Sequence, residues 1–319
     1  QMAGGDRART ARAAARAGEV IAAVPRAALW RMTAGAALIS TTSIFVRWAH
    51  VGPTESAFWR MFFGGAMLFA LLLMRGQWRG IEWRDWAWLV LPAFAFGADL
   101  FIWHRSIEYI GPGLATLVAN FQVFVMALAG VLFFRERLGP RFIFGLVLAL
   151  IGLWLLVGVD WNSFTPRFRL GVWLGLSTGV AYAVYLLSLR RAQLTRPNLT
   201  PMRALCLNSL ICAAMLAVAV LAERGSFAIP DGETWAALLG LGLFGQVLGW
   251  VLIATAMPQL PASLVGLLLL LQPALSFVLD VILFARPTGA SDWIGLALSL
   301  LGIFVGSVRR RPAPVAEPA

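Results

Sequence analysis

The sequence predicts an all-α, polytopic membrane protein with ten transmembrane helices arranged as two inverted five-helix repeats. Three observations carry this prediction: the composition, the number of long apolar runs, and an internal match between the two halves of the chain. Hydrophobic residues occupy 60% of the 319 positions and charged residues 13%, whereas soluble domains hold about 45–50% and about 25%. An aromatic content of 12% excludes a disordered chain, and two cysteines exclude a disulfide scaffold.

Ten apolar runs are long enough to cross a bilayer. Backbone polar groups in lipid must form hydrogen bonds within their own segment, so a crossing segment is a helix. A helix needs about 20 residues to cross the bilayer. The runs cover residues 28–48, 54–74, 86–105, 113–134, 141–158, 170–190, 202–222, 234–255, 261–284 and 290–308. The breaks between them carry turn residues, as in Gly111-Pro112-Gly113 and Gly139-Pro140. The connections are short, so we expect no inserted soluble domain.

Arginine sets the expected orientation. All 26 basic residues are Arg, and the net charge is +11. A nucleic-acid-binding protein would gather such charge on one folded face. Here the Arg residues separate the apolar runs, so we expect no nucleic-acid partner. With the N-terminus inside, 19 Arg fall on the inner side and 6 on the outer side, so the positive-inside rule places both termini in the cytoplasm. Residues 1–27, rich in Arg and Ala, and residues 309–319 are the expected cytoplasmic tails.

The two halves of the chain match each other at a shift of 150 residues. The shift brings together Gln122 and Gln272, Gly139 and Gly289, Gly145 and Gly295, and Gly152 and Gly302. The expected first repeat is 28–158, the connecting loop is 159–169 and the second repeat is 170–308. Because each repeat has five spans, the two would cross the membrane in opposite senses. Such inverted repeats are typical of secondary transporters, whose substrate site lies near the midplane between the halves.

One motif resembles that of a known family. The run Phe133-Phe134-Arg135-Glu136-Arg137-Leu138-Gly139, followed by Gly145 and Gly152, resembles the motif that ends each repeat of EamA-type transporters, which belong to the drug/metabolite transporter superfamily. The second copy, Ala285-Arg286-Pro287-Thr288, lacks the Glu. Within the superfamily the chain is similar to the YddG-type aromatic amino-acid exporters.

The resemblance implies a secondary transporter. Its expected function is export of small metabolites, above all aromatic or other neutral amino acids, across the bacterial inner (plasma) membrane by alternating access. A Walker A motif needs a Lys, and the sequence contains none, which agrees with transport without ATP. We expect no cofactor and no metal, and as partners only a small-molecule substrate and the lipid bilayer. The sequence does not define an oligomeric state.

Polar and aromatic residues at membrane depth are the predicted substrate site. At 1.5 Å per residue, Gln122, Gln246 and Gln272 each lie about 15–18 Å from the end of a span, near the midplane. They either bind a substrate amino or carboxylate group or form hydrogen bonds between helices. The full set of predicted cavity residues is Ser40, Asp99, Trp103, His104, Asn120, Gln122, Tyr182, Tyr185, Gln246, Trp250 and Gln272.

Two charged residues share an estimated depth in neighbouring spans. Asp99 lies about 9 Å from the outer end of the third span, and Arg60 lies at the same depth in the second. One interpretation is a structural ion pair between them. A second is a cavity-facing Asp99 that binds a substrate ammonium group or titrates. A third is that either side chain snorkels towards water.

Two other function classes compete with an exporter. A lipid or lipid-headgroup flippase would share the inverted repeat. An intramembrane enzyme would need a paired acid and base or a metal cluster within a span, and the sequence shows neither. We therefore do not expect an enzyme.

Overall fold

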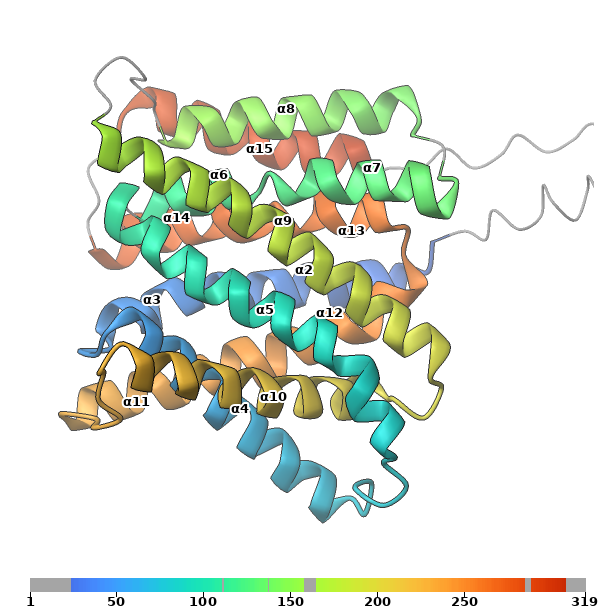
Figure 1. The fold of residues 1–319 in the computed structure, drawn as a ribbon. Coiled ribbons are helices and arrows are strands. Elements are labelled where there is room, and N and C mark those ends of the chain that lie inside the picture. The colour runs from blue at the N-terminus through green and yellow to red at the C-terminus, as the bar shows by residue number, and fades with distance from the viewer. Residues whose placement is uncertain (1–23, 111, 137, 158–164, 285–287, 308–319) are drawn as a thin grey trace, which may run out of the picture.

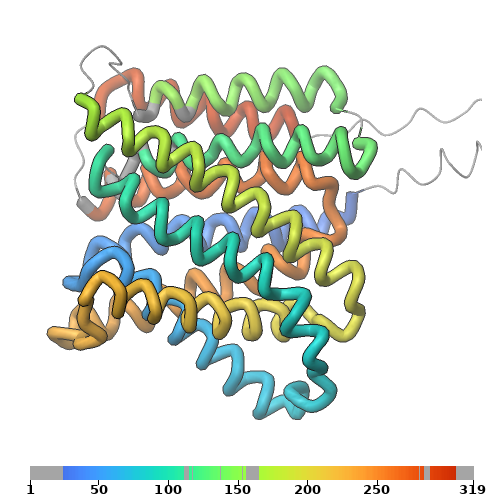
Figure 2. Tube along the Cα trace, viewed as in Figure 1, coloured from blue at the N-terminus to red at the C-terminus, as the bar shows by residue number. Residues whose placement is uncertain are grey.

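The computed structural model describes residues 24–307 except 111, 137, 158–164 and 285–287. Every regular element in the described part is a helix. The helices run back and forth between two sides of one bundle (Figures 1 and 2). We call the side where α2 begins and α15 ends the terminal side, and the opposite side the loop side. Most of both predicted tails, residues 159–164 of the predicted connecting loop and residues 285–287 of the second motif lie outside the described residues.

The described part of the first half of the chain contains seven helices. They are α2 (Arg26–Ser40), α3 (Thr42–Trp48), α4 (Pro53–Met74), α5 (Trp83–Ile110), α6 (Pro112–Ala119), α7 (Gln122–Phe134) and α8 (Pro140–Val157). Two of the predicted spans are interrupted here. The first breaks at Thr41, between α2 and α3, and the fourth breaks at Asn120 and Phe121, between α6 and α7.

The second half follows a similar order. Its helices are α9 (Pro166–Thr195), α10 (Pro201–Ala222), α11 (Gly232–Gly240), η2 (Leu241–Gly249), α12 (Trp250–Ala256), η3 (Met257–Gln259), α13 (Ala262–Leu269), α14 (Leu271–Phe284) and α15 (Ala290–Ser307). Element η2 is a π-helix within a continuous helical run. The ninth predicted span breaks at Leu270, between α13 and α14.

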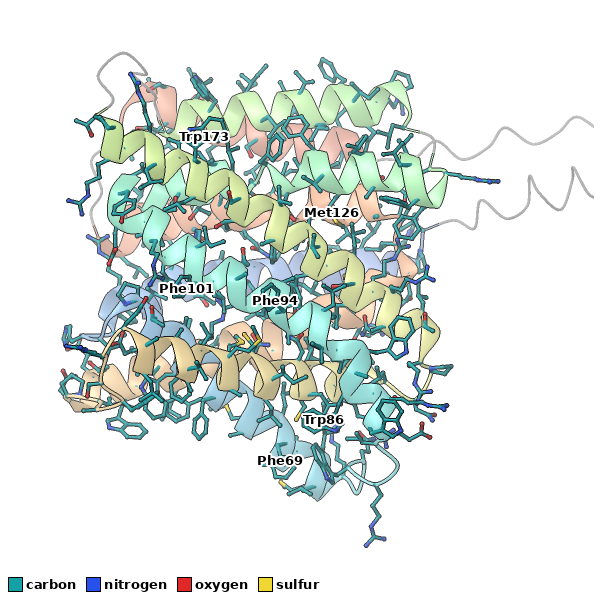
Figure 3. All side chains as sticks on the ribbon, in the orientation of Figure 1. Phe69, Trp86, Phe94, Phe101, Met126 and Trp173 are labelled. Atoms are coloured by element: carbon teal, nitrogen blue, oxygen red, sulfur yellow. The ribbon has the colours of Figure 1, made fainter. Side chains whose placement is uncertain are left out.

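Six helical segments of the described part are long and apolar enough to cross a membrane. They are Pro53–Met74, Trp83–Ile110, Pro166–Thr195, Pro201–Ala222, Gly232–Gln259 and Ala262–Leu283. Side chains such as Phe94 and Trp173 extend from the outer surface of the bundle (Figure 3), as expected where lipid is the solvent. The other four predicted spans coincide with helices that are shorter or interrupted, so the count of ten stays a prediction.

Two helices begin where the sequence places a capping threonine before a proline. The Thr165 hydroxyl accepts a hydrogen bond from the Phe168 N–H (3.3 Å) ahead of α9, and Thr200 does the same for Arg203 (3.4 Å) ahead of α10. Proline fits the first helical position because its missing N–H would have no partner there. These Thr-Pro pairs therefore fix where the two helices start.

Helices α8 and α15 pack backbone against backbone through glycine. A Cβ atom at Gly145 would lie 2.5 Å from the carbonyl oxygen of Gly302, and a Cβ at Gly152 would come equally close to that of Gly295. Only glycine permits such an approach.

The Glu136 carboxylate joins the α7–α8 connection to the start of α13. It accepts hydrogen bonds from the Ala262 N–H (2.7 Å), the Ser263 N–H (3.2 Å) and the Ser263 hydroxyl (2.6 Å). The first N–H groups of a helix have no partner within the helix, and the helix dipole favours a negative charge beside them. Glu136 thus caps a helix about 126 positions further along the chain.

Candidate functional site

A cavity of about 110 Å³ lies in the centre of the bundle. Its walls come from both halves of the chain: α2 to α7 on one side, and α9, α12 and α14 on the other. All three breaks in the predicted spans border it, through Thr42, Asn120 and Gln272. At each break a backbone N–H bonds to the carbonyl three residues back instead of four, as for Thr41, Phe121 and Leu270. Interrupted helices at membrane depth are tolerated where they line a cavity.

Two opposite charges line this cavity. Arg60 of α4 and Asp99 of α5 are 6% and 7% exposed. Among the described side chains, no nitrogen–oxygen distance of 4.0 Å or less joins them. The predicted ion pair is therefore not observed as a direct contact, although the two groups interact electrostatically across the cavity. The Arg60 guanidinium lies 5.8 Å from the centre of the Phe96 ring, and its Nε has no hydrogen-bond partner.

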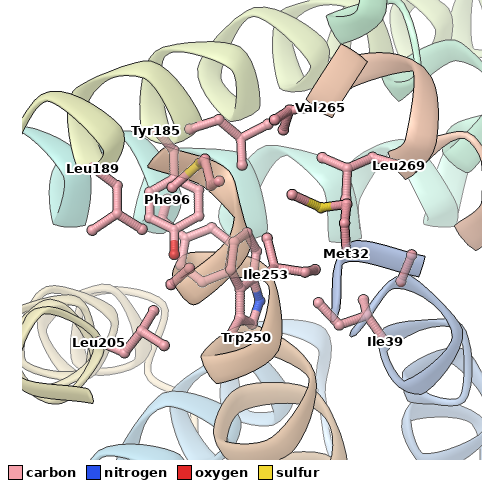
Figure 4. Close-up of a cluster of buried hydrophobic side chains, with 14 of the residues drawn as sticks. Met32, Ile39, Phe96, Tyr185, Leu189, Leu205, Trp250, Ile253, Val265 and Leu269 are labelled. Atoms are coloured by element: carbon pink, nitrogen blue, oxygen red, sulfur yellow. The ribbon is translucent and has the colours of Figure 1, made fainter. Parts of the chain in front are cut away.

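An aromatic cluster closes one end of the cavity. The rings of Phe96 and Tyr185 stack at 4.2 Å, and Trp250 meets both edge-on, at 5.4 Å from Phe96 and 4.9 Å from Tyr185. Figure 4 shows these rings among buried aliphatic side chains that include Leu189, Leu205 and Ile253. Phe96 and Trp250 border the cavity, whereas Tyr185 lies behind them.

Side-chain amides and hydroxyls supply the remaining polar lining. Tyr182 of α9 and Gln272 of α14 both line the cavity. The Gln272 Nε2 and the Gln122 Oε1 have no partner in the structure. Asn120 donates from Nδ2 to the Thr116 carbonyl (2.6 Å), four residues back. Buried polar atoms without partners are costly, so these amides are available to a bound ligand.

The structure brings seven of the eleven predicted site residues to the cavity and leaves four elsewhere. Those at the cavity are Asp99, Trp103, Asn120, Gln122, Tyr182, Trp250 and Gln272. Those that do not border it are Ser40, His104, Tyr185 and Gln246.

Three of the four have hydrogen-bond partners elsewhere, and the fourth, Tyr185, stacks on Phe96. The Ser40 hydroxyl donates to the Ala37 carbonyl (2.6 Å), and His104 forms a hydrogen bond with the Leu100 carbonyl (2.6 Å). Gln246 donates to the Ser209 hydroxyl (2.8 Å), which is the interhelical bonding that the sequence left as an alternative for the three Gln.

Besides Arg60, five polar lining residues were absent from the predicted set: Thr42, Ser43, Thr116, Thr178 and Ser276. Ser276 lies one helical turn after Gln272 and so on the same face of the helix, and this spacing could have predicted it as a cavity residue. Thr42 and Ser43 follow the helix break at Thr41. The break changes which side chains of this span face the cavity, so regular helical spacing does not predict these two. In the described part of the chain, no three His, Cys, Asp or Glu side chains are grouped to hold a metal ion.

Comparison with known proteins matches residues 26–158 and 169–308 to the EamA-like transporter family. The transporter YwfM of Bacillus subtilis is 27% identical over 288 residues, covering 88% of this chain and 93% of its own. The aromatic amino acid exporter YddG of Ancylobacter novellus is 27% identical, covering 78% and 85%. The threonine/homoserine exporter RhtA of Salmonella typhimurium is also 27% identical, covering 70% and 73%.

A solved crystal structure shares the fold, with a TM-score of 0.75 at 23% identity over 88% of this chain and 96% of that one. The two family matches together span most of the sequence. With its apolar helices, the chain is a multi-pass membrane transporter and not an enzyme, and it belongs to the EamA-like transporter family.

Proposed function

We propose that this transporter exports amino acids, aromatic or other neutral ones, through the central cavity. The observation that carries the proposal is the pair of opposite charges, Arg60 and Asp99, that line one cavity without contacting each other. An amino acid carries a carboxylate and an ammonium group on the same carbon. Arg60 would bind the carboxylate and Asp99 the ammonium group, because buried charges need partners of opposite sign.

The walls of the cavity suit the side chain of such a substrate. Trp103, Tyr182 and Trp250 line it and offer ring faces for stacking or for apolar contact. The free amides of Gln122 and Gln272 complete the polar contacts. Relatives named as exporters of aromatic amino acids and of threonine and homoserine support this substrate class.

The proposal includes ten spans in two inverted repeats, 28–158 and 170–308. The helix breaks at Asn120 and at Leu270 support this, because the shift that relates the halves also relates these two positions. The contacts between α8 and α15 support it too. Gly145 meets Gly302 while Gly152 meets Gly295, which is the exchange of partners that a two-fold axis between the repeats predicts.

The transport cycle would be alternating access across the bacterial inner membrane, with both termini cytoplasmic. Trp103 and Thr116 lie in the loop-side parts of α5 and α6 and are partly exposed. The cluster of Phe96, Tyr185 and Trp250 is fully buried. In this state the cavity would be open to the loop side, and the aromatic cluster would be the barrier that opens towards the cytoplasm.

Counterflow in proteoliposomes tests the proposal. The ligands are tryptophan, tryptamine without the carboxylate, and indole-3-propionate without the ammonium group. Asp99→Asn should weaken competition by tryptophan and tryptamine but not by indole-3-propionate, because it removes the charge that indole-3-propionate leaves unpaired. Arg60→Gln should weaken competition by tryptophan and indole-3-propionate but not by tryptamine, for the matching reason. Asp292→Asn, which changes a charge at the start of α15, is the control.

Equal losses for all three ligands in both variants would refute these roles. Transport of a labelled phospholipid at the rate seen for tryptophan would favour the flippase alternative instead.

A further inference from the structure

A second hollow lies on the flank of the bundle, apart from the central cavity. Its volume is about 840 Å³, and no residue lines both. The apolar lining comes from three helices: Trp88 and Leu91 of α5, Phe133 and Phe134 of α7, and Val184 and Leu187 of α9. Helix α9 packs against both α5 and α7, so the hollow spans helices from both halves of the chain.

The apolar lining of this hollow faces outward. Leu91 is 57% exposed and Phe133 is 78% exposed. In a membrane protein such a surface meets lipid tails. Val184 lies 11 residues before the end of α9 at Thr195, which is about 16 Å along the helix. The hollow therefore runs from the terminal side towards the middle of the membrane, as an acyl chain does.

Each of the three helices carries an arginine at the terminal-side end of the hollow. Arg84 lies one turn before Trp88, Arg135 directly follows Phe134, and Arg191 lies one turn after Leu187 and lines the hollow itself. All three are exposed, and none forms an ion pair with a carboxylate in the described part of the chain.

The nearby acidic groups are engaged elsewhere. Glu82 and Asp85 both accept hydrogen bonds from Arg196 at 2.8 Å, and Glu136 caps α13. The rim formed by Arg84, Arg135 and Arg191 is therefore positively charged, and no carboxylate among the described residues pairs with it.

We propose that this hollow binds one anionic diacyl phospholipid, with an acyl chain against the apolar lining and the headgroup phosphate at the three arginines. The apolar lining alone would accept any lipid tail, whereas the rim selects for negative charge. Basic pockets between transmembrane helices bind anionic headgroups in this way. The site is separate from the substrate cavity, so the proposal does not depend on which substrate the protein carries.

Native mass spectrometry of the full chain in detergent micelles tests the proposal. Phosphatidylglycerol and phosphatidylcholine of the same acyl length are titrated in parallel, and the unmodified protein should prefer phosphatidylglycerol. The triple variant Arg84→Gln, Arg135→Gln, Arg191→Gln should lose affinity for it by about 5-fold per arginine. Phosphatidylcholine has the same phosphate, but its ammonium group cancels the net charge, so its affinity should fall much less and the preference should be lost. The control is Arg169→Gln, an exposed arginine at the opposite end of α9, which should leave both affinities unchanged. An unchanged preference in the triple variant would overturn the proposal.

A second variant keeps all three arginines and fills the hollow. Leu91→Trp should weaken binding of both lipids by at least several-fold, because the acyl chain loses its space. Glycerol phosphate, which has the headgroup charge and no acyl chain, should not displace the lipid at millimolar concentration. Displacement by glycerol phosphate, or full lipid binding by Leu91→Trp, would overturn the assignment to a phospholipid. Leu91→Trp tests the phospholipid proposal even if the triple arginine variant does not fold.

Discussion

The Glu136 cap on α13 gives a stability prediction whose size follows from the structure. Glu136→Ala removes the acceptor of three hydrogen bonds, two from backbone N–H groups and one from a hydroxyl. Loss of an N-cap side chain costs about 1 kcal/mol, and up to about 2. Loss of the negative charge at a helix N-terminus adds about 0.3–1 kcal/mol. Because Glu136 is partly exposed, water replaces some of the lost contacts, so we expect a total of about 2 kcal/mol.

The assay is reversible unfolding in mixed micelles, followed by circular dichroism as the denaturing detergent increases. Glu136→Gln keeps an acceptor oxygen without the charge and should lose about half as much. Glu108→Ala removes an exposed carboxylate at the end of α5 and is the control. A Glu136→Ala protein within 0.5 kcal/mol of the control would refute the capping role.

Gly130 provides an independent check of the same contact. A Cβ atom there would lie 2.6 Å from the Glu136 carboxylate, so Gly130→Ala should displace the cap and destabilise the protein. If the clash acts through Glu136, the double variant Gly130→Ala, Glu136→Ala should be no less stable than Glu136→Ala alone. Additive losses would mean that Gly130 matters for another reason.

Three further predictions concern other parts of the fold. Gly302→Leu should lower the melting temperature by several degrees because a Cβ atom there would lie 2.5 Å from the carbonyl oxygen of Gly145. Gly289→Ala should not, because a Cβ atom there would meet only the Ser291 hydroxyl, at 3.7 Å. Arg224 has a φ of 57°, so Arg224→Gly should stabilise the protein by about 1 kcal/mol in the same unfolding assay. The hydrogen bond to Asp231 raises the pKa of His50 above 6.5, so the stabilisation from this contact is complete below pH 6.5 and is lost as the pH rises through the raised value. An NMR titration should give a pKa for His50 that falls to about 6.5 in Asp231→Asn.

The helical segments could be predicted from the sequence because a span is a property of local composition. Each apolar run coincides with one or more helices. The breaks at Thr41, Asn120 and Leu270 could not be predicted, because hydropathy does not change where the backbone departs from a regular helix. A run such as Leu267-Leu268-Leu269-Leu270-Leu271 carries no mark of the break inside it.

The same breaks limited prediction of the site. Depth along a span picks out polar residues near the midplane, and two of these, Gln122 and Gln272, border the cavity. Depth does not say which side of a helix faces the cavity. Gln246 lies at the expected depth but donates a hydrogen bond to Ser209 of α10, a contact between segments that are far apart in the sequence. Only tertiary structure separates a binding amide from one that joins two helices.

The separation of Arg60 and Asp99 is the strongest argument that the cavity is built for a zwitterion. A direct ion pair would satisfy both charges without a ligand, so neither Arg60 nor Asp99 would need a charged group on the substrate. Here the two groups are almost fully buried and do not touch, so each still needs a partner. A ligand with one charge would satisfy one group and strand the other, and a stranded buried charge costs about 3–5 kcal/mol. A ligand with both charges satisfies the two groups together. The cavity should therefore reject tryptamine and indole-3-propionate relative to tryptophan by about 100-fold or more, and comparable affinities for the three ligands would contradict this reasoning.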